Sequence, residues 1–276
     1  MCRWVAYHGD PIYVDTLVTR PSHSLVDQSL NTEMNFNTDG SLWSVNGDGF
    51  GIGWYTDKFE AALFKDTRPA WNDENLHEIC ASVKSKIFMA HIRATTTGSV
   101  QRNNSHPFKY KNWLFQHNGH MENFDIVRRD LQMDISPELY RQLKGTTDSE
   151  TFFLLALTYG LETDPKTALQ KMIRRIEDAS EANRIELILN LSCTISDGEK
   201  LYTIRYAANE KTKSQYYSNE EGCIKDINSG CAMIPSNSVI VVSEPLDELG
   251  KKWNEVPENS FMTVADGDVH IETLMD

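Results

Sequence analysis

The order in which strand-length and helix-length patterns follow one another is the feature that most constrains this fold. An apolar run of strand length at residues 5–7 comes first, helical patterns dominate the middle, and further strand patterns begin at residue 185. The longest helical pattern, residues 165–183, carries apolar residues on one face and charged residues on the other. Strands, then helices, then strands favour an α+β fold in which two sheets are in contact and helices cover their outer sides. No repeat or linker is visible, so we predict one domain over residues 1–276.

Local patterns predict the individual elements. A turn is expected at residues 9–11 and a short helix at residues 21–29, with Ser22 as its cap. The polar residues of that helix either line a pocket or face water. Further helices are predicted at residues 76–83, 122–131 and 147–160. Strands are predicted at residues 61–65, 87–90, 113–115, 185–195, 201–206, 239–242, 261–264 and 269–271, with a hairpin turn at residues 196–198.

Composition excludes several classes of partner. The chain has 276 residues, 40% of them hydrophobic, which is enough for a sizeable core. Its net charge of −13 disfavours nucleic acid and anionic membranes as main partners, because both attract basic surfaces. The start lacks the basic and then apolar pattern of a signal peptide, and no run of about 18 apolar residues occurs. A cytoplasmic location is therefore expected.

The cysteines are odd in number and widely scattered. None of them forms a C-x-x-C pair, which argues against a disulfide framework and against a zinc site. We interpret four of the five as core or surface thiols and predict no metal: Cys80, Cys193, Cys223 and Cys231.

The fifth cysteine, Cys2, is the candidate nucleophile. Removal of Met1 would give it both a thiol and a free α-amine, groups that titrate in model peptides near pH 8.5 and 7.7–8. The amine can then take the proton of the thiol, directly or through water, so that one residue supplies nucleophile and base. The alternative is that Cys2 is an ordinary buried cysteine near the start of a strand.

Four glycines alternate within residues 46–55, NGDGFGIGWY. Glycine is unfavourable in a strand unless another backbone or a ligand approaches closely, or a positive φ is needed. The spacing matches neither a P-loop nor a dinucleotide fingerprint. Close ligand contact and a tightly packed strand entry are both consistent with it.

Polar residues follow the strand predicted at residues 87–90. Arg93 offers a planar fork of donors suited to a carboxylate, and the hydroxyls of Thr96 and Thr97 can add hydrogen bonds. An internal salt bridge is the alternative role for Arg93.

The strand predicted at residues 113–115 is expected to stop at Gln116-His117-Asn118-Gly119. The amide of Asn118 and the backbone N–H of Gly119 can then point at one oxygen and stabilise the oxyanion of a tetrahedral intermediate. An ordinary Asn-Gly turn is the alternative.

Thr147 stands three residues before Glu150, the spacing of a capping box at a helix start. Asp148 lies beside that cap, where the helix start holds a carboxylate in place. Capping alone is one explanation of this segment and a binding role for Asp148 is the other.

These residues occur together with motifs that resemble the class II glutamine amidotransferases, which are N-terminal nucleophile hydrolases. The resemblance extends over most of the chain and is closest to the stand-alone type that includes YafJ proteins and γ-glutamyl amidohydrolases. It implies a four-layer αββα sandwich of two packed, mainly antiparallel sheets. The motifs, in the order of the family, are MCR, NGDGFGIGWY, HIRATTTG, NNSHPF, FQHNG and TTDSE, with PSHSL and SEPL less specific.

The resemblance also implies roles for these residues. Cys2 would be the nucleophile, with Asn118 and Gly119 as the oxyanion hole. Arg93 would bind the α-carboxylate of a glutamine or γ-glutamyl group and Asp148 its α-ammonium. The matching motifs add Thr96, Thr97 and His106 to the substrate-binding residues. No cofactor is implied.

Three functions follow from these expectations. The first is hydrolysis of a γ-glutamyl amide through a Cys2 thioester, with release of glutamate and ammonia or an amine. The second is a glutaminase subunit that delivers ammonia to a separate synthase partner, because no synthase-sized segment follows in this sequence. The third is a γ-glutamyl-binding protein without turnover. Neither the leaving group nor the oligomeric state follows from the sequence.

Overall fold

The computed structural model describes residues 2–34, 45–58, 60–95, 98–247 and 253–275. In these residues the strands form two large antiparallel sheets and one small hairpin.

The first sheet contains the start of the chain. Its seven described strands lie in the order β13-β9-β12-β1-β4-β2-β3, and every paired neighbour is antiparallel. The first strand of the chain therefore lies inside the sheet. In that order, the strands are Asn254–Glu255, Tyr216–Ser218, Val239–Val242, Arg3–Tyr13, Lys84–Ile92, Phe50–Tyr55 and Ala61–Asp66.

The second sheet has six described strands in the order β15-β14-β8-β7-β6-β5, again antiparallel throughout. The predicted hairpin joins β7 to β8 in this sheet. In that order, the strands are Asp268–Thr273, Ser260–Ala265, Leu201–Ala208, Leu189–Ser196, Trp113–Met121 and Phe108–Tyr110. The small hairpin pairs β10 (Gly222–Ile224) with β11 (Ala232–Ile234).

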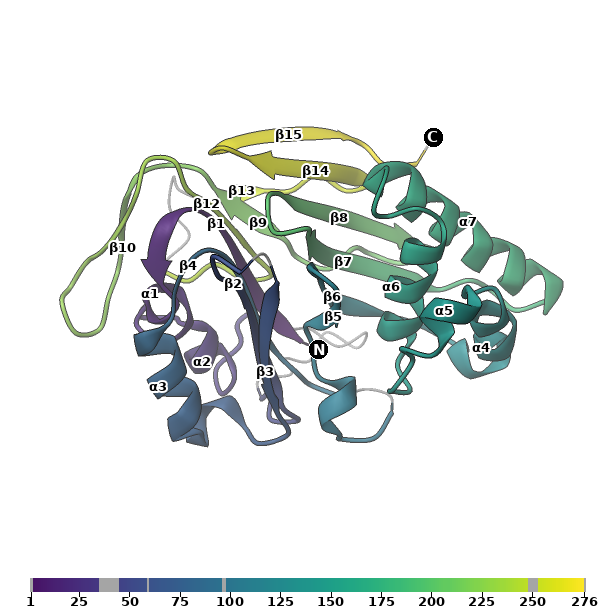
Figure 1. The fold of residues 1–276 in the computed structure, drawn as a ribbon, viewed down its shortest axis with the longest axis horizontal. Coiled ribbons are helices and arrows are strands. Elements are labelled where there is room, and N and C mark those ends of the chain that lie inside the picture. Colours follow the sequence, from purple (N-terminus) through teal and green to yellow (C-terminus); the bar gives the residue numbers. More distant parts are fainter. Residues whose placement is uncertain (1, 35–44, 59, 96–97, 248–252, 276) are drawn as a thin grey trace.

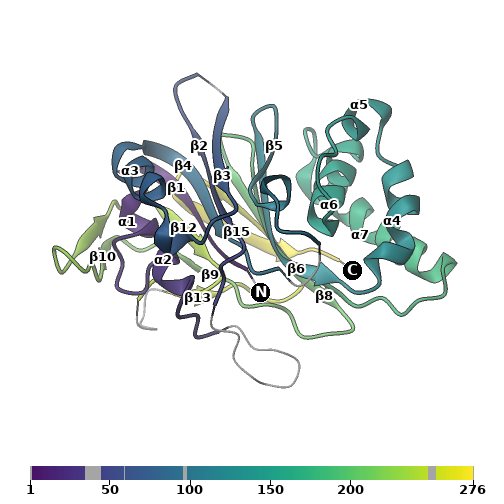
Figure 2. The ribbon, with the colours of Figure 1, turned by 90° about the horizontal axis from the view of Figure 1, so that it is seen from below.

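Helices cover the outer side of each sheet (Figures 1 and 2). The first sheet packs on α1 (Asp15–Val18), α2 (Leu25–Gln28) and α3 (Glu74–Ser82). The second sheet packs on α4 (Phe124–Met133), α5 (Pro137–Tyr140), α6 (Asp148–Thr158) and α7 (Pro165–Ala182). Short 3-10 turns occur at Ala70–Asn72 and Arg102–Asn104. The predicted αββα layering is confirmed.

Three separate apolar cores follow from this layering, one under each helical layer and one between the sheets. Strand β1 contributes to two of them, because successive side chains of a strand point to opposite faces. Trp4 and Ala6 lie in the core between the sheets, whereas Val5 and Tyr7 lie in the core under α1–α3. By this alternation, the side chain of Cys2 faces the second sheet.

Near the start of the chain, one local prediction is wrong and another is only partly confirmed. The turn expected at residues 9–11 is a bulge inside β1, where the register to β4 shifts between His8 and Ile12. The helix expected at residues 21–29 is the single turn α2, and Ser24, not Ser22, accepts the capping hydrogen bond from the backbone N–H of Asp27. The chain does not turn there, because β1 pairs with β4 again from Ile12 onward.

The prediction of thiols is wrong for two cysteines. Cys223 and Cys231 form a disulfide whose Cα atoms are 5.3 Å apart, next to the small hairpin β10–β11. The hairpin brings together two residues that no C-x-x-C spacing marks. Cys80 and Cys193 are buried thiols, as expected.

None of the helices in the described part of the chain has the length and hydropathy needed to span a bilayer.

Candidate active site

Cys2 lies immediately before β1 and is half-buried. Its Sγ lies 3.7 Å from the carbonyl oxygen of Ala94, which follows β4. Arg3 pairs with Ile92 in the antiparallel register, so the backbone of Cys2 lies beside that of Arg93. The candidate nucleophile and the candidate carboxylate-binding residue therefore lie at the same end of two neighbouring strands.

Asn118 projects from the second sheet toward the first. It lies on the same face of β6 as Gln116, whose side-chain amide donates to the backbone oxygen of Val5 across the sheets at 3.1 Å. The side chain of Asn118 is 1% exposed, and neither its Oδ1 nor its Nδ2 has a hydrogen-bond partner among the described residues. A buried side-chain amide without a partner is uncommon in folded proteins, because it loses its hydrogen bonds to water.

The backbone N–H of Gly119 points away from the neighbouring strand β7. Alternate residues of a strand direct their N–H groups to the same side, and that of Met121 leaves the sheet to donate to Asp148 at 3.0 Å. Gly119 must be glycine, because an added Cβ would lie 1.9 Å from the backbone oxygen of Asn190. The expected strand end before Asn118 is wrong, as is the Asn-Gly turn, because β6 continues to Met121 in register with β7.

Asp148 is the first residue of α6, and its carboxylate is buried. Its Oδ2 accepts the N–H of Met121, and its Oδ1 accepts the N–H of Ser149 at 2.7 Å and is 3.1 Å from the Ser149 hydroxyl. These contacts fix the carboxylate beside the end of β6, two residues beyond Gly119.

The capping box predicted at this helix is half correct. Thr147 accepts the N–H of Glu150 at 3.2 Å, as expected. The Glu150 carboxylate instead accepts the N–H groups of Lys144 and Gly145. The cap therefore does not explain the buried position of Asp148.

Arg93 is 4% exposed and donates from Nη1 to the backbone oxygen of Ser99 at 3.1 Å. Burial lowers the pKa of its guanidinium, which loses contact with water. Negative charge at Cys2, Asp48 and Asp148 works against that shift of the Arg93 pKa. Among the described residues Arg93 makes no salt bridge within 4.0 Å, so the internal ion pair that the sequence left open is not observed.

The glycine-rich segment holds the backbone around Arg93. Asp48 N–H donates to the Arg93 oxygen at 3.0 Å, and Arg93 N–H donates to the Gly49 oxygen at 2.8 Å. The Asp48 carboxylate accepts the N–H of Thr95 at 2.7 Å. An added Cβ at Gly51 would lie 2.2 Å from the His106 backbone oxygen. The structure therefore supports the tightly packed strand entry for this segment.

Three buried histidines have neighbouring rings: His91 from β4, His106 from the loop before β5, and His117 from β6. Burial lowers the pKa of each ring, that of His91 to about 3, so all three are neutral near pH 7. His91 Nε2 donates to the His117 backbone oxygen at 3.1 Å, and His117 Nε2 donates to that of Asn190 at 3.0 Å. The other ring nitrogen of His117 then accepts the hydroxyl of Ser149 at 2.8 Å.

The structure brings together most of the residues predicted for the site. Cys2 and Arg93 lie at the same end of neighbouring strands, and Asn118 and Gly119 lie on the strand that Asp148 contacts. His106 lies deeper, with its ring 4.3 Å from that of His91 and 4.6 Å from that of Phe108. Thr96 and Thr97 lie outside the described residues.

Three residues near the site were not predicted to act there. Asp48 holds the backbone of Arg93, Ser149 holds the Asp148 carboxylate, and His117 holds the Ser149 hydroxyl. Each lies within a motif that the sequence analysis quoted. The motifs were visible, but the pairing of these residues depends on which strands and helices meet.

The arrangement combines a thiol, a buried amide without a partner, a cation and an anion. Such a set can bind an amino-acid head group by both of its charges and stabilise an oxyanion at an attacked carbonyl. No group of three or more His, Cys, Asp or Glu within the described ranges is arranged to hold a metal ion.

Comparison with known proteins gives matches over nearly the whole chain. A sequence profile of the family "Glutamine amidotransferases class-II" matches residues 17–275. "Probable glutamine amidotransferase DUG3" of Saccharomyces cerevisiae is 31% identical over an alignment 307 residues long, which covers 100% of this chain and 85% of that protein. "Gamma-glutamyl-hercynylcysteine sulfoxide hydrolase" of Mycolicibacterium smegmatis is 22% identical, with 99% of this chain and 100% of that protein covered.

Solved structures agree with this result. A glutamine aminotransferase class-II domain protein from Silicibacter pomeroyi superimposes with a TM-score of 0.72 at 30% identity, and each chain is covered completely. The glutamine phosphoribosylpyrophosphate amidotransferase of B. subtilis has a TM-score of 0.65 at 14% identity, over 99% of this chain and 49% of that one. The second likeness concerns the fold alone.

Proposed function

Because this chain belongs to the class II glutamine amidotransferase family, we propose that it hydrolyses the γ-glutamyl amide bond of glutamine or a γ-glutamyl compound through a thioester on Cys2. Its αββα fold is that of N-terminal nucleophile hydrolases, and its relatives support an amidohydrolase activity. We propose that residues 1–276 act as one such domain. The observation that carries the proposal is the buried, unpartnered amide of Asn118, which faces the sheet from which the Cys2 side chain projects.

The reaction starts from a chain without Met1. The free α-amine of Cys2 takes the thiol proton, and the sulfur attacks the γ-carbonyl carbon of the substrate. The carbonyl π electrons move to oxygen, and the Asn118 amide and the Gly119 N–H donate to the resulting oxyanion. Collapse of this intermediate breaks the C–N bond, and the leaving nitrogen receives the proton held by the α-ammonium group of Cys2.

A water molecule completes the cycle. The neutral α-amine of Cys2 accepts a proton from water as the water oxygen attacks the thioester carbon. The same two donors stabilise the second oxyanion. The C–S bond then breaks, the sulfur recovers its proton and glutamate leaves. The products are glutamate and ammonia, or glutamate and an amine.

The head group of the substrate is bound by its two charges. The Arg93 guanidinium pairs with the α-carboxylate, to which the hydroxyls of Thr96 and Thr97 add hydrogen bonds. The Asp148 carboxylate pairs with the α-ammonium, and its fixed contacts to β6 keep it beside the oxyanion donors. His106 supports this end of the site through its ring, which packs on that of His91, two residues before Arg93. These contacts define the γ-glutamyl group and leave the amine side free to vary.

The test is glutamate release by purified protein whose mass shows that Met1 is absent. Substrates should include glutamine, γ-glutamyl dipeptides, γ-glutamyl thiol conjugates and γ-glutamyl anilides, with the matching α-glutamyl dipeptides as the control series. We expect glutamate from at least one γ-glutamyl compound and none from the α-glutamyl series. Cys2→Ala should remove this activity.

Two results would contradict the proposal. Activity retained by Cys2→Ala would exclude the thioester on this residue. No glutamate from any γ-glutamyl compound, together with tight binding of one of them, would indicate a binding protein without turnover.

A further inference from the structure

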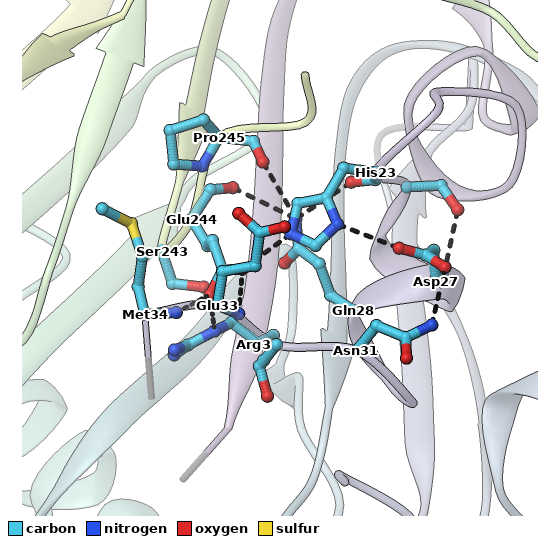
Figure 3. A network of polar contacts seen from close by, with 12 residues as sticks. Arg3, His23, Asp27, Gln28, Asn31, Glu33, Met34, Ser243, Glu244 and Pro245 are labelled. Atoms are coloured by element: carbon cyan, nitrogen blue, oxygen red, sulfur yellow. Dashed lines mark hydrogen bonds and ion pairs between the residues drawn. The ribbon is translucent and has the colours of Figure 1, made fainter. Parts of the chain in front are cut away.

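A polar network contacts the start of β1; it is buried at Arg3 and Glu244 and partly exposed at His23 and Asp27 (Figure 3). By the alternation of side chains along β1, Arg3 points to the opposite face from Cys2. The charged members of this network, called here the Arg3 network, are Arg3, Glu244, His23 and Asp27. His23 comes from the PSHSL segment and Glu244 from the SEPL segment, and the reaction described above uses neither. The network begins at the residue that follows the nucleophile.

Arg3 links the network to the nucleophile. Its guanidinium is 1% exposed and pairs from Nε with Glu244 Oε2 at 2.7 Å. The same guanidinium donates from Nη1 to the backbone oxygen of Cys2 at 2.9 Å. One rigid planar group therefore holds both a buried carboxylate and the carbonyl of the candidate nucleophile.

Glu244 is held at both of its oxygens. Oε2 accepts from Arg3 and from the N–H of Met34, and Oε1 accepts from His23 Nε2 at 2.6 Å and from the N–H of Glu33 at 2.8 Å. Burial works to raise the pKa of this carboxyl, but the hydrogen bond from His23 and the charge of Arg3 outweigh it and lower the pKa. Glu244 is therefore ionised and fixed in place.

His23 closes the outer end of the network. Its Nδ1 lies 2.9 Å from the carboxylate of Asp27 in α2, which begins two residues after His23, while Nε2 contacts Glu244. Burial works against the charged ring, but the hydrogen bonds to Glu244 and Asp27 prevail and raise the pKa of His23. Each contact thus restrains the next one, from Asp27 to the Cys2 carbonyl.

The position of this carbonyl matters because the nucleophile would be the first residue of the mature chain. A terminal residue has one peptide bond instead of two and is poorly ordered unless other contacts hold it. In Cys2, rotation about the bond between Cα and the carbonyl carbon moves the α-amine and the thiol together relative to the oxyanion donors. The hydrogen bond from Arg3 opposes this rotation. A displacement of about 1 Å at a reacting group can cost roughly 100-fold in rate.

We propose that the Arg3 network positions the Cys2 nucleophile, and that Glu244 and His23 act by holding the Arg3 guanidinium on the Cys2 carbonyl. The inference rests on the proposed function, because it concerns the same nucleophile. Arg3, Glu244 and His23 are positioning residues and touch no reacting atom.

The direct test uses Arg3→Lys and measures Cys2 itself. Lysine keeps the charge beside Glu244, but its single ammonium lacks the fork that spans the carboxylate and the carbonyl. The first measurement is the rate constant for alkylation of Cys2 by iodoacetamide, followed by mass spectrometry of the N-terminal peptide. We expect it to rise several-fold, because the half-buried thiol becomes more accessible once the terminal residue is no longer held. On a γ-glutamyl substrate, kcat should fall roughly 10- to 100-fold, because the nucleophile is displaced from the oxyanion donors, and KM should stay within about twofold.

A matched control is Arg205→Lys. Arg205 is also buried, pairs with Glu255 at 2.7 Å and donates to the backbone oxygen of Lys213 at 2.9 Å. It belongs to β8 and makes no contact with Cys2 among the hydrogen bonds of the described residues. Its variant should keep the alkylation rate and kcat of the parent, whatever happens to its unfolding temperature.

A second variant keeps the inference testable if Arg3→Lys does not fold. Arg3→Gln combined with Glu244→Gln removes both buried charges together, so neither is left without a partner. It should alkylate as fast as Arg3→Lys and show the same loss of kcat. Parent rates of alkylation and turnover in a folded Arg3 variant, or changes that only follow the unfolded fraction, would overturn the positioning role. Alkylation needs no γ-glutamyl substrate, so its result is separate from failure of the proposed function, which hydrolysis by Cys2→Ala would reveal.

Discussion

Replacing Asn118 with leucine should lower activity and raise stability at the same time. Asn118 is 1% exposed, and both polar atoms of its side chain lack a partner in the described structure. An unsatisfied buried polar group costs about 1–3 kcal/mol of folding free energy. Leucine has nearly the same shape and no polar atoms, so Asn118→Leu should recover part of that cost, on the order of 1 kcal/mol.

The catalytic effect has the opposite sign. Loss of one oxyanion donor lowers kcat by about 10²–10³, equivalent to roughly 2.7–4 kcal/mol of transition-state stabilisation. KM should change little, because this amide donates to the charge that develops in the transition state. An asparagine kept for structure alone would show neither this rise in stability nor this loss of kcat.

The measurements are urea unfolding and steady-state release of glutamate. Gln116→Leu is the matched control, because Gln116 lies on the same face of β6 and donates to Val5 at 3.1 Å. Gln116→Leu loses this hydrogen bond, worth about 0.5–1.5 kcal/mol, and also loses the Gln116 Oε1, which has no partner among the described residues. The control should therefore change in stability by less than about 1.5 kcal/mol and keep kcat per folded molecule. A destabilised Asn118→Leu protein with the parent kcat would refute the reasoning.

Three further predictions concern the head-group residues and acid stability. Arg93→Lys should raise KM for a γ-glutamyl substrate at least tenfold, with a smaller change in kcat, because lysine loses the bidentate contact with the carboxylate; an unchanged KM would argue against this role. Asp148→Asn should remove the preference for substrates with an α-ammonium over those without it, measured as the ratio of their kcat/KM values, and a preserved ratio would count against the assignment. Burial lowers the pKa of His91 from 6.5 to about 3, so the unfolded chain binds more protons in this interval and stability should fall as the pH drops from about 6.5 toward 3. In His91→Gln the slope of unfolding free energy against pH should be smaller by about 1.4 kcal/mol per pH unit, and equal slopes in urea titrations would exclude a neutral His91.

The sequence correctly predicted the helices and strands that depend on residues close to one another in the chain. Helix α7 follows from its apolar spacing, and the start of α6 follows from the Thr147 side chain that caps it. Strand β12 agrees with its predicted residues at both ends, because a short apolar run is bounded by polar residues. These features depend on neighbours within a few positions in the chain.

The remaining features depend on which distant segments meet. Asn118-Gly119 has the composition of a turn, but pairing with β7 keeps both residues in a strand. Residue 119 must be glycine because a side chain there would collide with the backbone oxygen of Asn190. Arg3 and Glu244 are 241 residues apart, and nothing near either residue marks the other as its partner. Pairing of this kind is a tertiary property and overrides local propensity. The disulfide between Cys223 and Cys231 spans only eight residues, but it forms because β10 pairs with β11, and this short hairpin was not predicted.

The most direct measurement of the central claim is the intact mass of the protein quenched with acid during turnover of a γ-glutamyl substrate. The account predicts a chain that lacks Met1 and carries one γ-glutamyl group, which peptide mapping assigns to the sulfur of Cys2. The group should be absent from Cys2→Ala and should accumulate in any variant whose deacylation is slowed. Turnover by a chain that retains Met1, or an acyl group on another residue, would contradict the account.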